Sequence, residues 1–168
     1  MFDFSYLLRE SGVRMVLLDD LDKRILNVLQ EDASISNQAL AEKVFSSPPT
    51  CLRRVKRLEK TGIIQKRVTL LDAQALGSDL TAIVEINLTQ QSAEVFDAFE
   101  ALIVSESSVK QCYRVTSGPD FIVIIQVPDM NAYHELVGKL FTATNHVRNV
   151  RTFFSTYRSK FDTTVTLA

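Results

Sequence analysis

Apolar residues recur at helical spacing in three stretches near the start of the chain: Leu21–Leu29, about Asn37–Val44, and Ser47–Lys60. Residues three and four positions apart share one face of a helix, so each stretch predicts an amphipathic helix. In the third stretch the apolar stripe is narrow, which predicts that one face packs and the rest is solvated. The members of that stripe are Cys51, Leu52, Val55 and Leu58.

The ends of these stretches carry residues that favour helix starts, stops and turns. Ser47 is suited to cap the third helix, and Pro48 suits its first position, where no N–H group is needed. Phe45–Ser47 leave only three residues between the second and third helices. Two helices joined by so short a turn predict a helix-turn-helix, and the first helix completes its small core. Gly62 ends the third helix, and the β-prone run Ile63–Leu71 predicts a short wing.

From residue 81 onward the pattern changes to strands that alternate with helices. Apolar helical spacing follows Ser92 and again follows Pro128-Asp129, where a helix begins at Met130. The resulting order β-α-β-β-α-β predicts a ferredoxin-like domain whose two helices cover one face of the sheet. The predicted strands are Thr81–Thr89, Val109–Thr116, Phe121–Val127 and Arg148–Tyr157, with a tail strand over Phe161–Leu167.

The run Phe121–Val127 is almost wholly apolar, which predicts a strand buried on both faces. Its second face needs a cover, and no further helix remains in the chain to supply one. A second copy of the same sheet is the simplest cover, so the sequence predicts a dimer through this domain. A two-fold dimer also presents two copies of the third helix to the two half-sites of a palindrome.

The fold class expected is therefore α+β, with an N-terminal winged helix-turn-helix and a C-terminal ferredoxin-like domain. The expected boundaries are an N-terminal arm over 1–17, the helix-turn-helix over 18–71, a linker over 72–79 and the second domain over 80–168. Met15 is an alternative start, because the regular pattern begins just after it. The first residues have no basic segment followed by an apolar core, so a secretory signal is not expected.

Composition is that of an ordinary globular protein, with 46% hydrophobic and 23% charged residues. The purely apolar runs are too short for a transmembrane helix. Cys51 and Cys112 are distant and form no Cys-x-x-Cys pair, so we interpret both as small buried hydrophobes in a reducing, cytoplasmic compartment. His134 and His146 lack a third ligand at suitable spacing, so neither a metal site nor a catalytic site is expected.

Charge is concentrated on the third helix and the residues just after it. From Pro48 to Arg67 there are seven basic residues and one acidic residue, whereas the whole chain has a net charge of −1. A basic helix on an otherwise acidic protein is the electrostatic pattern of nucleic-acid binding, although a merely solvated basic face is the alternative. Residues near the helix start reach base edges and later ones meet phosphates, and Arg54 is long enough to read a guanine. The expected DNA-binding residues are Ser47, Thr50, Arg53, Arg54, Lys56, Arg57, Lys66 and Arg67.

Several motifs occur together in an order that is familiar. The chain resembles the Lrp/AsnC family of transcription regulators from Leu18 to Tyr157. The resemblance implies a winged helix-turn-helix, an effector-binding βαββαβ domain, dimers that assemble further, often to octamers, and amino-acid effectors bound where dimers meet. The motifs that carry it are Leu18–Gln30, Ile35-Ser36-Asn37 with Leu40-Ala41, Ser47-Pro48 with Cys51–Glu59, Gly62-Ile63-Ile64, Val127–Tyr133 and Arg151-Thr152.

The chain departs from the family pattern at two places. The family often has Gly in the helix-turn-helix turn, where this chain has Phe45. Its ligand loop usually reads Gly-x-x-Asp, whereas this chain has Ser117-Gly118-Pro119-Asp120. The resemblance implies effector-binding residues at Tyr113, Arg114, Gly118, Asp120, Met130, Phe153, Phe154 and Ser155.

The large apolar residues in that set favour an aliphatic or thioether amino acid, so leucine or methionine is the expected effector. No other cofactor is expected. The partners expected are double-stranded DNA with a palindromic operator, the amino acid and further copies of the chain. Two other classes of function stay open at this point. One is an enzyme, because some proteins that resemble this family are sirohaem decarboxylases with the same two-domain layout. The other is a subunit that lacks its own operator and co-assembles with another regulator.

Overall fold

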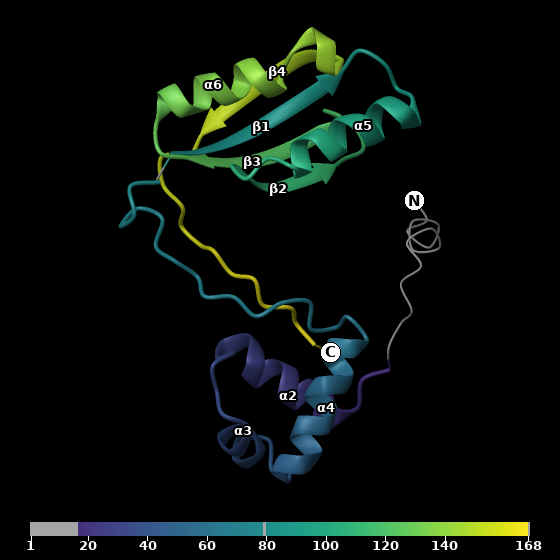
Figure 1. Ribbon diagram of the computed structural model, residues 1–168, viewed down its shortest axis with the longest axis vertical. Coiled ribbons are helices and arrows are strands. Elements are labelled where there is room, and N and C mark those ends of the chain that lie inside the picture. Colours follow the sequence, from purple (N-terminus) through teal and green to yellow (C-terminus); the bar gives the residue numbers. More distant parts are fainter. Residues whose placement is uncertain (1–16, 79, 168) are drawn as a thin grey trace. The chain divides into compact units, whose positions relative to one another are not determined.

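The computed structural model describes residues 17–78 and 80–167. These residues form two compact units, which Figure 1 shows together with their connections. One unit contains residues 17–70 together with 162–167, and the other is Leu71–Phe161. The expected arm lies almost entirely outside the described residues. The tail after Phe161 belongs to the first unit, whereas it was expected with the second.

Among its described residues, the first unit contains three helices: α2 (Asp20–Glu31), α3 (Asn37–Lys43) and α4 (Pro48–Lys60). Ser36 caps α3 by accepting a hydrogen bond from the backbone N–H of Ala39. Gly62 follows α4 with φ of +77°, as expected of a residue that ends a helix. The helices enclose a small core whose buried apolar members are Ile25, Leu26, Leu40, Ala41, Val44, Cys51, Val55 and Leu58. The helix-turn-helix expected from the spacing is thereby confirmed.

Phe45 occupies the left-handed conformation in the turn between α3 and α4, with φ of +55°. Its N–H donates to the carbonyl of Glu42 at 3.3 Å, and the N–H of Ser46 donates to the carbonyl of Ala41 at 2.9 Å. The turn therefore keeps the backbone geometry that glycine adopts most easily. The side chain of Phe45 is 91% exposed, so no packing offsets the strain.

Two expected strands are not formed. The run Ile63–Leu71 and the tail Phe161–Leu167 form no strand, because no neighbouring strand among the described residues pairs with them. The tail instead packs on the first unit. The amide of Gln30 donates to the carbonyl of Val165 at 3.2 Å and accepts from its N–H at 2.6 Å. Leu167 packs against the core of that unit.

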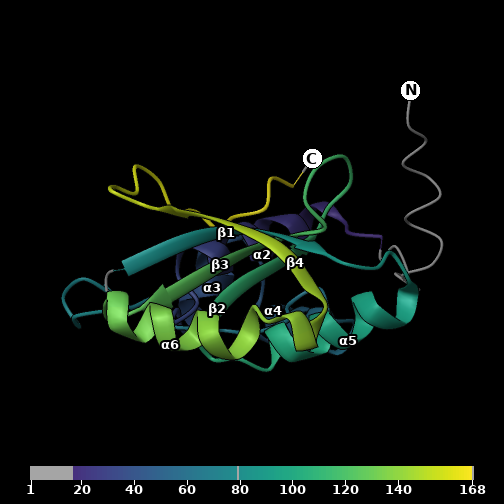
Figure 2. The same cartoon turned by 90° about the horizontal axis from the view of Figure 1, so that it is seen from above.

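The second unit is a four-stranded antiparallel sheet in the order β2-β3-β1-β4. Helices α5 and α6 lie on the same side of this sheet (Figures 1 and 2). The topology confirms the ferredoxin-like prediction. In chain order the elements are β1 (Leu80–Leu88), α5 (Ala93–Val104), β2 (Val109–Arg114), β3 (Phe121–Val127), α6 (Met130–Leu140), a short 3-10 helix η1 (Ala143–Asn145) and β4 (Val147–Phe154).

Burial alternates along β3, although its sequence is almost uniformly apolar. Phe121, Val123, Ile125 and Val127 are buried beneath the helices, whereas Ile122, Ile124 and Gln126 are only half-buried. The prediction that β3 is buried on both faces therefore holds for one face in the single chain. The opposite face stays partly exposed, because both helices lie on the same side.

Candidate functional site

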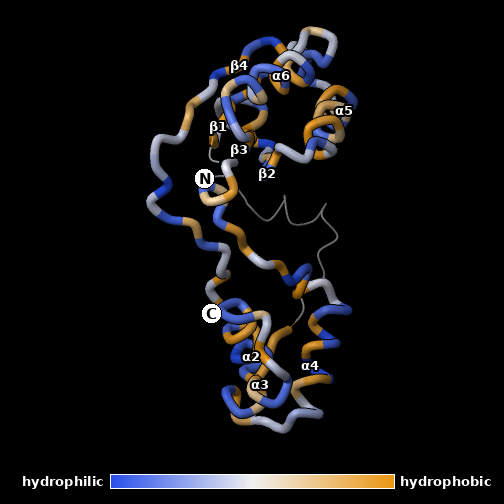
Figure 3. The backbone as a smooth tube through the Cα atoms, turned by 60° about the vertical axis from the view of Figure 1, so that its left-hand side comes forward, coloured by the Kyte–Doolittle hydropathy of each residue, from blue (hydrophilic) through white to orange (hydrophobic). Residues whose placement is uncertain are grey.

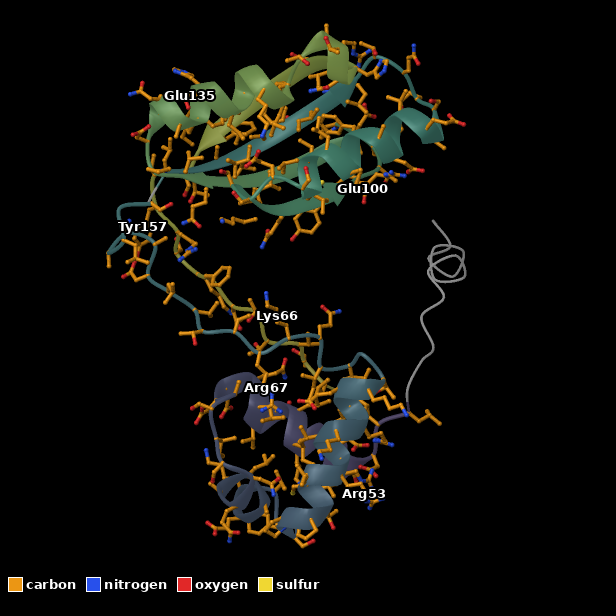
Figure 4. All side chains as sticks on the ribbon, in the orientation of Figure 1. Arg53, Lys66, Arg67, Glu100, Glu135 and Tyr157 are labelled. Carbon is orange, nitrogen blue, oxygen red and sulfur yellow. The ribbon has the colours of Figure 1, made fainter. Side chains whose placement is uncertain are left out.

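The outward side of α4 is basic, and its inward side belongs to the core. Cys51, Val55 and Leu58 are buried, whereas Leu52 is 45% exposed and so lies outside the stripe to which its spacing assigned it. Figure 3 shows hydrophobic and hydrophilic segments alternating along α4. Figure 4 shows Arg53 on the side of α4 that is turned away from α3. The residues with exposed side chains on α4 include Arg53, Lys56 and Lys60.

The start of α4 differs from expectation in one detail. Ser47 stands at the capping position with extended backbone, but its side chain makes no capping hydrogen bond. Its Oγ instead lies 2.8 Å from Oγ1 of Thr50. The physical reason is that Pro48 and Pro49 carry no N–H groups, so the first turn has few donors for a cap to satisfy. Two hydroxyl groups therefore sit together at the N-terminus of the basic helix.

Arg54 is held within the first unit instead of projecting outward. Its Nη1 lies 2.6 Å from Oδ2 of Asp19 and 3.3 Å from Oδ1 of Asp22. Arg57 donates from Nη2 to Asp22 as well. Asp22 is fully buried, and among the described residues it is the one buried polar or charged side chain. The two arginines therefore neutralise a buried carboxylate and fasten α4 to α2.

The same contacts anchor the start of α2. Asp19 caps this helix by accepting from the N–H of Asp22 at 2.9 Å, and Asp22 accepts from the N–H of Asp19 at 3.2 Å. That backbone hydrogen bond, followed by the Arg54 guanidinium, holds the pKa of Asp19 below its ordinary value. The hydrogen bond to Asp19 raises the pKa of Arg54 in turn. Arg54 Nε is buried and has no hydrogen-bond partner among the described residues.

Sequence patterns contained a signal for this network. Asp22 precedes Ile25 and Leu26 by three and four residues, so it lies on the buried face of α2 and not only in its first turn. An acid on a buried face requires a cation from a neighbouring helix. Arg54 lies three residues after Cys51 and four before Leu58, so it is positioned to supply that cation.

Lys66 and Arg67 follow α4 outside any helix or strand (Figure 4). Arg67 donates from Nη2 to Oε1 of Glu59 at 2.9 Å. Both partners of this ion pair are nearly half exposed, so the pair contributes little stability. The two basic side chains therefore remain available to a ligand that approaches the end of α4.

The effector residues implied by the family resemblance divide between the two ends of the sheet. Asp120, before β3, accepts from the N–H of Leu88 at 2.7 Å and from Nε2 of Gln91 at 2.9 Å. Its own N–H donates to the carbonyl of Ile86 at 2.9 Å. The carboxylate thus fastens the loop containing Gly118 to the end of β1. Both of its oxygens already have donors, so an effector ammonium would have to compete with them.

Arg114 and Tyr113 lie near that end but on opposite faces of β2. Arg114 donates to Asp97 at 2.8 Å and to Glu100 at 2.7 Å, both on α5. The hydrogen bond that Arg114 donates to Asp97 raises the pKa of Arg114. Tyr113 is 51% exposed on the face without helices, because it pairs with Ile122. The side chains of Arg114 and Tyr113 therefore do not line the same site within one chain.

The remaining residues lie at the other end. Phe153 and Phe154 end β4, and the N–H of Ser155 donates to the carbonyl of Thr81 at 2.9 Å. Phe154 pairs with Ala82, which precedes Leu88 by six residues along β1. Six residues of strand span about 20 Å. Phe153, Phe154 and Ser155 therefore do not surround Asp120 within one chain.

Metal-binding clusters, reactive thiols and membrane-spanning helices would be further signs of function among the described residues. Among them, no cluster of three or more His, Cys, Asp or Glu side chains is arranged to hold a metal ion. Cys51 and Cys112 are free thiols, and partial burial raises the pKa of Cys112. In the same part of the chain, no helix has the length and apolar character needed to cross a bilayer.

Comparisons with known proteins match both units. Residues 18–65 fit the family described as winged helix-turn-helix DNA-binding, and residues 81–165 fit the Lrp/AsnC ligand binding domain. The chain belongs to the Lrp/AsnC family of transcription regulators. The leucine-responsive regulatory protein of Salmonella typhimurium is 38% identical over 136 residues, which are 81% of this chain and 83% of that protein. An HTH-type transcriptional regulator of Haemophilus influenzae is 37% identical over 91% of each chain.

Solved structures of the family agree with this fold. An AsnC family transcriptional regulator from Agrobacterium tumefaciens has a TM-score of 0.83 and 31% identity, over 89% of this chain and 97% of that one. A transcriptional regulator from Neisseria meningitidis, in complex with L-Met, has a TM-score of 0.80 and 30% identity over the same shares. The chain is thus a DNA-binding transcriptional regulator of the Lrp/AsnC type with an amino-acid binding domain.

Proposed function

We propose that this regulator works in the cytoplasm and reads a palindromic operator with the outward face of α4. The observation that carries the proposal is the exposed basic face of Arg53, Lys56 and Lys60, which opposes a fully buried core stripe. Phosphates attract such a face, and the N-terminal part of a reading helix reaches the base edges. Ser47, Thr50 and Arg53 lie in that part. Lys56, Lys66 and Arg67 are suited to the backbone.

Arg54 and Arg57 receive a different role in this proposal. A guanine contact by Arg54 would require breaking its bonds to Asp19 and Asp22, which are 2.6 and 3.3 Å long. These arginines instead position α4 against α2. The base-reading arginine is then Arg53, whose side chain is exposed and makes no ion pair with another described residue.

The dimer proposed from the sequence would form through the sheet face that carries no helices. Ile83 is 38% exposed and Phe153 is 41% exposed, and the two stand opposite each other in the β1–β4 register. Ile124 pairs with Ile83 from the other side and Tyr113 pairs with Ile122, so these residues share the face. Contiguous exposed apolar residues of this kind mark interaction surfaces. A two-fold dimer, which assembles further with other dimers, would pair two α4 helices with two half-sites.

Leucine or methionine is proposed as the effector. The support comes from relatives named as leucine-responsive, from the L-Met complex of the Neisseria meningitidis regulator, and from the exposed apolar side chains of Met130 and Phe153. Because Asp120 and Phe153 lie at opposite ends of the sheet, we infer that residues of more than one chain complete the site. A site between dimers satisfies this requirement.

The test of DNA reading compares two adjacent arginines. Fluorescence anisotropy would measure affinity for duplexes selected by the purified chain from a random library, and thermal unfolding would measure stability. Arg53→Ala should weaken binding by about 1–3 kcal/mol without lowering stability, as loss of a base-reading arginine does. Arg54→Ala should lower the stability of the first unit together with DNA affinity. Loss of binding with Arg54→Ala alone, at unchanged stability, would contradict these roles.

The effector is tested by calorimetry of the full chain against each common amino acid. Leucine or methionine should give the tightest binding, because the exposed apolar side chains favour an apolar ligand. Phe153→Ala should weaken that binding. Asp120→Ala should lower the stability of the second unit, because the loop loses its anchors at Leu88 and Gln91. Tight binding of a charged amino acid, with no detectable binding of leucine or methionine, would contradict the proposed effector.

A further inference from the structure

The outward face of α4 contains an apolar position among its basic ones. Leu52 is 45% exposed, and Pro49, one turn earlier, is also exposed. The exposed side chains of Arg53 and Lys56 flank it, since Lys56 follows Leu52 by four residues on the same helix face. A single exposed leucine on a protein surface needs no explanation. Its position in the N-terminal half of a basic helix is what gives this one a functional meaning.

We propose that Leu52 contacts the methyl group of a thymine in the major groove, so that the chain selects an A·T pair at that position. The inference rests on the proposed function, in which α4 is the reading helix. The positive charge of this surface favours DNA as its partner. Arg54 and Arg57 already pair with acids of α2, and Arg67 pairs with Glu59. The charge left to face a partner is that of the exposed residues Arg53, Lys56, Lys60 and Lys66, and a protein partner would have to match it with acids.

The chemistry of the major groove explains why thymine is selected. Among the four base edges, the C5 methyl group of thymine is the apolar feature, and the remaining features are hydrogen-bond donors and acceptors. The side chain of Leu52 can neither donate nor accept. Against a methyl group it removes apolar surface from water, whereas against the amino group of cytosine it leaves a donor without a partner. A thymine is therefore preferred to a cytosine at this contact.

The position of Leu52 in the helix fits a base contact better than a backbone contact. It is the fifth residue of α4, which begins at Pro48. Residues near the start of a reading helix meet base edges. Arg53, the next residue, carries the charge that a neighbouring phosphate or guanine would meet. The two residues would together read adjacent positions through different chemistry, one apolar and one charged.

Thymine-to-deoxyuridine scanning tests this inference, because deoxyuridine lacks only the methyl group. The full chain would first select duplexes from a random library, and each thymine in a selected duplex would then be replaced singly. At one position per half-site, removing the methyl group should weaken binding by about fourfold, the loss expected for one buried methylene-sized group. Replacements elsewhere should leave affinity nearly unchanged.

The variant Leu52→Ala should bind the thymine and deoxyuridine duplexes equally at that position. Leu76→Ala is the matched control, because Leu76 is 67% exposed in the segment before β1. This control should keep the fourfold difference. Wild-type binding that ignores every replacement would overturn the inference while leaving DNA reading by α4 intact. Sensitivity that persists in Leu52→Ala would assign the methyl contact to another residue and also overturn it. Failure to select any duplex would instead overturn the proposed function.

Discussion

At the scale of single residues, neighbouring side chains on α4 point in different directions. Arg53 and Leu52 face solvent, whereas Arg54 turns inward to Asp19 and Asp22. One residue corresponds to about 100° of rotation around a helix, which is enough to move a side chain from an exposed face to a packed one. A run of basic residues is therefore not one functional surface. The run divides into residues that meet a ligand and residues that hold the helix in place.

Phe45 gives a residue-scale prediction about stability. A bulky residue in the left-handed conformation costs about 1–2 kcal/mol, and the 91% exposed ring recovers none of it by packing. Phe45→Gly removes this strain but adds freedom to the unfolded chain, which costs about 0.5–1 kcal/mol. The variant should therefore raise the free energy of unfolding by about 0.5–1 kcal/mol.

Denaturant unfolding of the purified variant measures this change. Ser46→Gly serves as the control, because Ser46 is not among the residues with positive φ and glycine there brings only added chain freedom. That control should lose stability. A loss of stability in Phe45→Gly as well would mean that the ring contributes an interaction to the folded turn.

At the scale of elements, the contact between α2 and α4 makes the first unit sensitive to acid. The folded chain lowers the pKa of Asp19 from its ordinary 3.8, through the N–H of Asp22 and then Arg54. A group with a lowered folded pKa contributes stability above its ordinary pKa, and that stability is lost as the pH falls through the folded value. The melting temperature of the first unit should therefore decrease as the pH is lowered past 3.8.

Asp19→Asn should flatten this decrease, because asparagine can still cap α2 but does not titrate. Asp20→Asn, which removes a charge from the same turn, is the control and should keep the wild-type slope. Asp32 also has a lowered pKa, through its bonds to Ser34, so some acid sensitivity should remain in the variant. Melting curves at a series of pH values measure all three chains, and identical slopes would show that the Asp19 contact does not form in solution.

At the scale of the whole molecule, the chain leaves the first unit after Leu70, forms the second unit and returns at residue 162. The returning tail adds two hydrogen bonds between Gln30 and Val165 and the packing of Leu167. Deleting 162–168 should lower the free energy of unfolding of the first unit by about 1–2 kcal/mol, the net contribution of about two exposed hydrogen bonds. The ligand-binding fold is thereby connected to the DNA-binding fold through both of its ends.

Hydrogen exchange of the α2 amides in the full chain and in the truncated chain measures this loss. Gln30→Ala should produce part of the loss in the full chain and no further loss after truncation, because both changes remove the same two hydrogen bonds. Additive effects of the two changes would show that Gln30 acts through some other partner.

Local pattern was sufficient for the helices, for the four strands of the sheet and for their order, but not for the two strands expected outside the sheet. Apolar spacing of three and four, the short turn at Phe45–Ser47 and the β-α-β-β-α-β alternation determined both folds, because each depends on residues close together in the chain. The basic character of α4 followed in the same way, since charge on a helix is a property of the sequence. Family resemblance supplied the effector domain, whose presence the match over residues 81–165 confirms.

Tertiary structure alone decided how individual side chains are used. The destination of Arg54 depends on Asp22, which lies 32 residues earlier, and the exposure of Leu52 depends on how α4 rotates against its neighbours. The separation of Asp120 from Phe153 follows from strand register, which pairs residues far apart in sequence. The strand expected over Ile63–Leu71 needed a partner strand to form. Contacts of this kind join residues that are far apart in the sequence, so the local spacing of apolar residues cannot predict them.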